Sequence, residues 1–261
     1  MYCRFVSLTI ILPTLNEAQN IGTLLKRLLI VFSDLPQFQI LVIDDLSTDG
    51  TQKEVERIAK LCHKVRLIVR DNPDGLTGAI KFGLSLADSD YIGWMDADGS
   101  MPADALLKLW LALDKTTDVI VGSRFVPGGG FKGVTSANKN FRTIHKNLRQ
   151  SNDSITAMFL SRILNLYLRI VLSNRIRDYT SGFIIIRSNK LVLSDLKGYY
   201  GEYCPVFLFK SLQKGLRILE VPYINLPREH GVSKTGTNLI SLVKTGTPYL
   251  TSALKVRLKL I

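Results

Sequence analysis

Two aspartates one residue apart, Asp96 and Asp98, follow a short apolar run in the segment YIGWMDADGSMP at 91–102. Residues two apart in a strand point to the same side, and the strand stops here, so both carboxylates should project from its C-terminal end. In open α/β sheets that end binds ligands. Two neighbouring carboxylates are costly unless a cation neutralises them, and a hard divalent metal carrying a nucleotide phosphate would do so. An Asp-rich turn with solvated carboxylates is the alternative that this segment leaves open.

Other polar residues follow the ends of further predicted strands. We expect strands at 7–12, 40–43, 65–69, 91–95 and 119–121, and helices at 18–32, 51–62, 76–86 and 103–113. This alternation predicts an α/β fold in which helices cover both faces of a mostly parallel sheet. The first strand leads into Pro13 to Glu17, the second into Asp44 and Asp45, and the fifth into Ser123 and Arg124. A ligand site along one rim of the sheet is therefore expected.

The second half of the chain is less regular. A glycine-rich break at 127–130 precedes a basic polar stretch at 131–153, which predicts a loop. The helix expected at 154–172 carries Ser161, Arg162, Asn165 and Arg169 as one narrow polar stripe on a largely apolar cylinder. Such a helix is buried in protein, or it lies along a membrane with its polar stripe in the head groups. We also expect a strand at 183–186, a helix at 202–212, a strand at 216–221, a polar loop at 227–236 and a basic amphipathic tail at 238–261.

Composition favours an anionic partner. The 261 residues are 46% hydrophobic and carry a net charge of +12, from 34 Lys plus Arg against 22 Asp plus Glu. The stretch 129–152 and the chain after Glu229 hold no acid, and such segments suit lipid head groups, nucleic acid or nucleotides. Three cysteines without metal-ligand spacing favour a reducing compartment. We predict no secretory signal and no membrane-spanning helix.

Several common nucleotide and hydrolase motifs are absent from the sequence. It contains no GxxxxGK[ST], no GxGxxG after the first strand and no GxSxG, and its three histidines are scattered. A nucleotide site built from carboxylates and loop backbone remains. In such a site Asp45 could bind a ribose or base edge, Asp98 with Asp96 could hold Mg²⁺ or Mn²⁺ on a diphosphate, and Arg124 could bind a second anion.

Five segments in order along the chain carry a family pattern: ILPTLNEAQNI, LVIDDLSTDGT, GLTGAIKFGL, WMDADGSMP and VGSRFVPGGG. They resemble family 2 glycosyltransferases of the GT-A fold. Two later segments, RDYTSGF and REHGVSK, are similar to the branch that transfers mannose to dolichyl or polyprenyl phosphate. The resemblance implies a catalytic domain at 1–237, with a nucleotide-binding half at about 1–127 and an acceptor half at about 128–237 that includes the basic loop and apolar helix at 131–173, and a membrane-proximal tail at 238–261.

The resemblance also implies roles for particular residues. The nucleotide-sugar would be bound by Pro13, Thr14, Asn16, Glu17, Asp44, Asp45, Gly75, Ala79, Asp96, Ala97, Asp98, Arg228 and Lys234. The acceptor phosphate would be bound by Arg124, Ser181 and Ser233, and catalysis would depend on Asp96, Asp98 and Arg124. The metal would be held by Asp96 and Asp98 with position 100, where the branch often has Gln. Ser100 stands there in this chain, and a hydroxyl is a poorer hard ligand than an amide oxygen.

The activity implied is inverting, metal-dependent transfer of a hexose, foremost mannose from GDP-mannose, to a polyprenyl or dolichyl phosphate on the cytoplasmic face of a membrane. A lipid phosphate is already an anion at neutral pH, so no strong general base is needed. A UDP-sugar donor of glucose or an N-acetylhexosamine is the alternative within this class. A sugar nucleotidyltransferase and a non-catalytic binder of anionic membrane or nucleic acid are the other classes that the sequence leaves open; a nucleic-acid partner is not expected.

Overall fold

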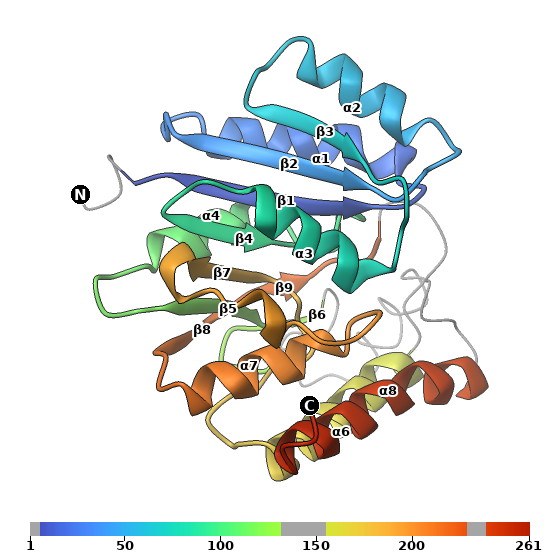
Figure 1. Ribbon diagram of the computed structural model, residues 1–261, viewed down its shortest axis with the longest axis vertical. Coiled ribbons are helices and arrows are strands. Elements are labelled where there is room, and N and C mark those ends of the chain that lie inside the picture. Colours follow the sequence, from blue (N-terminus) through green and yellow to red (C-terminus); the bar gives the residue numbers. More distant parts are fainter. Residues whose placement is uncertain (1–5, 132–154, 229–238) are drawn as a thin grey trace, which may run out of the picture.

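The computed structural model describes residues 6–131, 155–228 and 239–261. A central sheet holds seven strands in the order β3-β2-β1-β4-β7-β5-β8 (Figure 1). Their bounds are β1 Leu8–Thr14, β2 Phe38–Asp44, β3 Val65–Val69, β4 Tyr91–Trp94, β5 Val119–Ser123, β7 Ile184–Arg187 and β8 Ile218–Pro222. Two short strands, β6 at Gly130–Phe131 and β9 at Ile224–Asn225, pair separately. The predicted α/β fold with a mostly parallel sheet is confirmed.

Seven helices surround the sheet in the described part of the chain. They are α1 Ala18–Val31, α2 Thr51–Ala59, α3 Leu76–Leu86, α4 Ala103–Leu111, α6 Ile155–Val171, α7 Tyr203–Gln213 and α8 Leu239–Arg257. Two 3₁₀ turns, η2 at Ser188–Lys190 and η3 at Leu193–Asp195, follow β7. None of the described helices is both long enough and apolar enough to cross a lipid bilayer.

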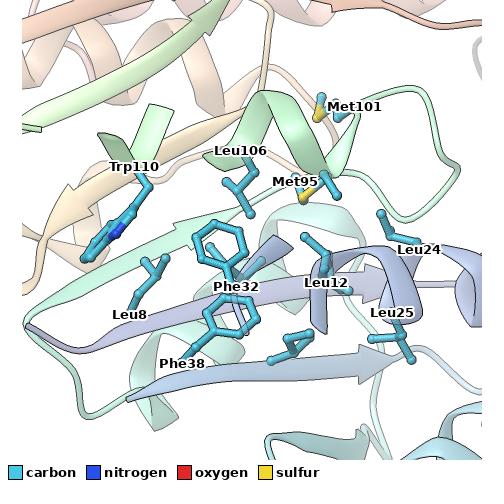
Figure 2. Packing of buried hydrophobic residues seen from close by; sticks show 14 of the residues in the cluster. Leu8, Leu12, Leu24, Leu25, Phe32, Phe38, Met95, Met101, Leu106 and Trp110 are labelled. Carbon is cyan, nitrogen blue, oxygen red and sulfur yellow. The ribbon is translucent and has the colours of Figure 1, made fainter. Parts of the chain in front are cut away.

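Alternation along the strands separates two hydrophobic cores. In β1, Ile10 and Leu12 pack on the face covered by α1, α2 and α4, whereas Ile11 packs on the face of α3 and α7. The first core is built around aromatic contacts: the rings of Phe32 and Phe38 stack with centroids 4.4 Å apart (Figure 2). Burial on both faces explains why the strands read as continuous apolar runs.

Among the described strands of the central sheet, β7 alone runs antiparallel to its neighbours. It lies between β4 and β5, and its first residue, Ile184, is level with Trp94 near the end of β4 and with Val121 in β5. Because β7 runs in the opposite direction, the residues just before it emerge at the C-terminal rim of the parallel strands. The segment 178–182 is thereby placed beside the residues that follow β4 and β5.

Helices α6 and α8 pack against each other beyond the last strands of the sheet (Figure 1). The polar stripe of α6 is divided, because Asn165 is only 3% exposed and points into the protein whereas Arg162 is exposed. The outward face is mainly apolar and carries Phe159, Ile163, Leu166 and Ile170, which are all exposed. The spacing of polar residues in the sequence predicted the stripe, but it did not predict which face of α6 packs against the rest of the protein.

Gly93 in β4 tests how tightly β7 is seated. A Cβ at this position would lie 2.8 Å from Ile10 Cδ1 and 2.9 Å from the Ile184 carbonyl oxygen. The backbone of β7 cannot retreat without losing its pairing, so Gly93→Ala should lower the free energy of unfolding by about 1–3 kcal/mol, measured by urea unfolding. Gly246→Ala in α8 is the control, because no atom lies within 4 Å of its Cβ and alanine favours a helix. Equal losses in both variants would contradict the crowding argument.

Candidate active site

Two adjoining cavities open at the C-terminal rim of the sheet. The smaller, of about 150 Å³, is lined by Pro13, Thr14, Leu15, Glu17, Asp45, Leu76, Ala79, Asp96, Ala97, Asp98, Tyr200 and Arg228. The larger, of about 620 Å³, reaches from Asp96, Asp98 and Ser100 past Arg124 and Ser181 to α6 and α8. The two cavities meet at the Asp96 and Asp98 carboxylates. Most of the residues predicted for nucleotide binding therefore surround one cavity, and those predicted for the acceptor that lie in the described chain line the other.

Asp98 is held from two sides. Its Oδ1 accepts a hydrogen bond of 2.9 Å from the Ser100 backbone N–H, and its Oδ2 lies 3.0 Å from Arg228 Nε. Arg228 reaches this position because the Leu226 N–H donates to the Ser100 carbonyl oxygen at 2.9 Å, which fastens the chain after β9 to the turn after β4. Arg228, which was predicted to bind the nucleotide-sugar, thus lies against the acidic pair.

Asp96 has an unusual electrostatic environment. Burial and the neighbouring Asp98 charge raise the pKa of its carboxyl to about 7, and the cations of Arg228 and Arg124 only partly oppose this shift. In the described residues, no group of three or more His, Cys, Asp or Glu side chains gathers as a ready-made metal site. Among the described residues, Asp96 and Asp98 are the carboxylates at the junction of the cavities that could hold a metal ion, and Ser100 lines the larger cavity with them.

Asp44 and Asp45, adjacent in sequence, have different surroundings. The buried Asp44 carboxylate accepts hydrogen bonds from Thr14 Oγ1, the Ser47 N–H and hydroxyl, and Gln52 Nε2. It lines neither cavity and instead holds the loop after β2 in place. Asp45 lines the smaller cavity, and Arg70 binds both of its oxygens, with Nε to Oδ1 at 2.6 Å and Nη2 to Oδ2 at 2.7 Å.

Arg70 is a site residue that sequence reasoning missed. Besides Asp45, its guanidinium contacts Asp74 and donates to the Gly75 carbonyl oxygen at 3.2 Å. It therefore ties the ends of β2 and β3 to the start of α3. The signal was available, because Arg70 directly follows the predicted strand 65–69 and so belongs to the same rim as Arg124. Gly75 contributes its backbone here and does not line either cavity.

Tyr200 is a second residue that sequence reasoning missed. It lines both cavities at their junction. Burial and the nearby Asp96 charge raise the pKa of its hydroxyl to about 12, so it is a neutral hydrogen-bond donor at physiological pH. The Glu202 carboxylate accepts the backbone N–H groups of Tyr199 and Tyr200, which holds this loop against the site. Glu202 is therefore structural.

Arg124 is a fixed cation in the wall of the larger cavity. Its Nε and Nη2 donate to the two oxygens of the fully buried Asp178 at 2.8 Å each, and its backbone N–H donates to the same carboxylate at 2.9 Å. Although burial alone would lower the pKa of this guanidinium, Asp178 more than offsets the effect and the pKa is raised. The guanidinium also lies 5.5 Å and 5.4 Å from the ring centroids of Phe125 and Phe131.

The remaining predicted residues fall into three groups. Ser181 lines the larger cavity. Its buried hydroxyl lies near the Tyr223 hydroxyl but makes no hydrogen bond of good geometry with any described residue. Asn16 lines neither cavity; it has φ +56° and its side-chain oxygen accepts the Thr48 N–H at 2.9 Å. Ser233 and Lys234 lie outside the described residues.

Comparison with known proteins identifies the family. The model of "Glycosyl transferase family 2" matches residues 9–191. An undecaprenyl-phosphate mannosyltransferase of Micrococcus luteus is 31% identical over 264 residues, covering 96% of this chain and 98% of that protein. A polyprenol monophosphomannose synthase of Mycolicibacterium smegmatis is 32% identical over 239 residues, covering 88% and 82%.

Solved structures agree on the fold. Glucosyl-3-phosphoglycerate synthase from Mycobacterium tuberculosis, in a crystal with Mn²⁺, UDP and glucosyl-3-phosphoglycerate, superposes with a TM-score of 0.63 at 16% identity, covering 97% of this chain and 80% of that one. Mannosyl-3-phosphoglycerate synthase from Rubrobacter xylanophilus gives 0.63 at 17% identity, covering 97% and 74%. The family model and the two full-length relatives show that the chain belongs to glycosyl transferase family 2, and the chain is a glycosyltransferase of the GT-A fold.

Proposed function

We propose that this enzyme transfers mannose from GDP-mannose to a polyprenyl or dolichyl phosphate, with inversion at the anomeric carbon. The observation that carries the proposal is the meeting of the two cavities at Asp96 and Asp98. A nucleotide in the smaller cavity would present its diphosphate and sugar at this junction, facing the larger cavity. The names of the full-length relatives, which are mannosyltransferases for polyprenyl phosphates, support the same acceptor class.

The acidic pair suits a divalent metal. Asp96 and Asp98 are hard oxygen donors, and the raised pKa of Asp96 marks a place where added positive charge is favourable. These two carboxylates would hold Mg²⁺ or Mn²⁺, with the Ser100 hydroxyl beside them. A divalent ion here supplies charge neutralisation for the leaving diphosphate. Arg228, which already lies on Asp98, supplies a second cation for that diphosphate.

The acceptor side needs a fixed cation and no general base. Arg124 would orient the acceptor phosphate, one oxygen of which forms the new bond to the anomeric carbon while the bond to the donor β-phosphate oxygen breaks. The electron pair of that bond leaves on the nucleoside diphosphate. No described histidine lines either cavity, which suits a nucleophile that is already ionised. We propose Ser181 as a second ligand to the acceptor phosphate.

A lipid acceptor also accounts for the walls of the larger cavity. Beyond Arg124 its lining is mainly apolar and includes Leu160, Leu164 and Tyr167 of α6 and Leu250 of α8. Helix α6 exposes further apolar side chains to the outside, next to the exposed cation Arg162, and α8 beside it exposes Lys255 and Arg257. We propose that this side of the enzyme rests on the cytoplasmic face of a membrane with anionic lipids.

The reaction is tested with a panel of labelled GDP- and UDP-sugars, a polyprenyl phosphate and Mn²⁺ or Mg²⁺. GDP-mannose should move label into the organic phase. Asp98→Asn should slow this transfer at least about 100-fold, because the divalent ion that would neutralise the leaving diphosphate loses a charged ligand. Asp104→Asn, the same change on the exposed side of α4, is the control and should keep wild-type activity. If only UDP-glucose gave labelled product, GDP-mannose would be the wrong donor. If Asp98→Asn kept its activity, the proposed role of Asp96 and Asp98 would be refuted.

The pKa of Asp96 predicts a stability difference that depends on pH. An unfolded aspartate ionises near pH 4, whereas the folded carboxyl retains its proton up to about pH 7. The folded state therefore loses stability as pH rises between these values, and Asp96→Asn avoids this loss. By urea unfolding in EDTA the variant should be more stable than wild type at pH 8, by up to about 4 kcal/mol, and equal to it near pH 4. Adding Mn²⁺ at pH 8 should stabilise only the wild type. Parallel pH profiles would contradict the assignment.

Membrane contact through α6 is tested by co-sedimentation with vesicles that contain anionic lipid. Ile170 is 76% exposed on α6, and Ile30 is 71% exposed on α1 at the other side of the sheet. Ile170→Asp should lower the bound fraction several-fold, because it places a charge in the apolar contact. Ile30→Asp is the matched control and should bind as wild type does. If both variants bind equally well, α6 is not the contact surface.

A further inference from the structure

We propose that Thr180 and Asn165 are positioning residues for the acceptor phosphate, because together they fix the direction in which Arg124 presents its free N–H groups. The inference rests on the proposed function in one respect, namely that an anionic acceptor binds beside Arg124. Neither residue touches the reacting atoms in this scheme, and both act through the guanidinium.

The Thr180 hydroxyl is the centre of the arrangement. Its oxygen accepts one hydrogen bond from Arg124 Nη2 and one from Asn165 Nδ2, each 2.8 Å long. With both lone pairs occupied, the hydroxyl hydrogen is left to point toward Asp178 Oδ1, 3.4 Å away. Thr180 therefore joins the Arg124–Asp178 ion pair to helix α6.

Asn165 is held in a single orientation. Its side-chain oxygen accepts the Tyr179 N–H at 2.8 Å, and its second amide hydrogen is donated to the Ser161 carbonyl oxygen at 3.0 Å. A flipped amide would set oxygen against the Ser161 carbonyl and N–H against N–H, so the hydrogen bonds assign the orientation. A buried amide with every group paired makes a rigid support.

The consequence for Arg124 follows from the planarity of guanidinium. Nε and one Nη2 hydrogen are taken by Asp178, and the other Nη2 hydrogen is taken by Thr180. With these three hydrogens fixed, the plane of the group and the direction of its two Nη1 hydrogens are fixed as well. Nη1 has no hydrogen-bond partner among the described residues, and Arg124 lines the larger cavity together with Thr180 and Ser181. The support thus fixes the donors that an acceptor phosphate would meet.

Packing alone does not account for this chemistry. Asn165 lies on the same inward face of α6 as the buried Leu168, and Leu172 just beyond the end of the helix is buried as well, so a leucine would also pack at position 165. Burying an amide costs free energy unless its partners repay it. The partners here are the loop that precedes β7 and, through Thr180, Arg124. We therefore assign the polar side chain at position 165 to holding the loop 178–182 and, through Thr180, Arg124.

The test measures binding of a short, water-soluble prenyl phosphate by calorimetry, and transfer to it under saturating donor. Thr180→Val, which keeps the shape and removes the hydroxyl, should raise the Kd and the acceptor KM about tenfold, as expected for a hydrogen bond to a charged group. The donor KM and the affinity for nucleoside diphosphate should stay unchanged. Thr180→Ser keeps the hydroxyl and should behave as wild type.

A double-mutant cycle separates positioning from a general structural role. In an Arg124→Ala background, Thr180→Val should weaken acceptor binding no further, because the group through which it acts is gone. An undiminished tenfold loss in that background, or equal behaviour of Thr180→Val and Thr180→Ser, would overturn the inference. Should Thr180→Val not fold, Asn165→Ala replaces it and should weaken acceptor binding in the same direction, again only when Arg124 is present. A wild-type enzyme that binds no prenyl phosphate would instead refute the proposed function.

Discussion

The site depends on neutralising acidic groups that the fold gathers at one buried rim. Asp45, Asp98 and Asp178 each pair with an arginine from another segment, namely Arg70, Arg228 and Arg124. Burying a carboxylate is costly without such a partner. The same pairs fasten the loops after β2, β4 and β5 to their neighbours. The contacts that neutralise the buried carboxylates therefore also fix the positions of these loops. Asp96 has no ion pair in the described chain, and its raised pKa makes it the place where the rim still needs a cation.

The reversed direction of β7 gives the larger cavity its geometry. In a fully parallel sheet, a strand between β4 and β5 would deliver its N-terminal loop to the opposite edge. Running antiparallel, β7 brings Asp178 and Thr180 to Arg124 and Ser181 into the larger cavity. The Gly122 N–H donates to the Phe183 carbonyl oxygen at 2.8 Å, which holds the two rim segments together. Most residues that line the smaller cavity come from the first half of the chain, and most residues that line the larger cavity come from the second.

Local sequence was sufficient for the elements and for most rim residues, because burial on both faces leaves apolar runs that end in polar residues. The segments 65–69 and 76–86 were predicted with the bounds that the structure shows for β3 and α3. Contacts between distant segments were beyond such reasoning. Nothing in the sequence near Asp44 indicates that its carboxylate accepts four hydrogen bonds. The apolar residues 183–186 likewise do not indicate whether their strand runs parallel or antiparallel to its neighbours. The inward orientation of the Asn165 side chain likewise depends on its hydrogen bonds with the loop 178–182.

Helix α6 joins three requirements of a lipid-phosphate transferase in one element. Its inward Asn165 supports Arg124 through Thr180, its flank lines the larger cavity, and its outer face is mainly apolar. An acceptor lipid that passes from a bilayer into this cavity exchanges one apolar environment for another, so its prenyl units gain little free energy from the transfer. Its phosphate, in contrast, must leave the hydrated head-group layer, and only a fixed charge can compensate for that loss. Selection of the acceptor should therefore reside in the phosphate and its arginine more than in the length of the chain.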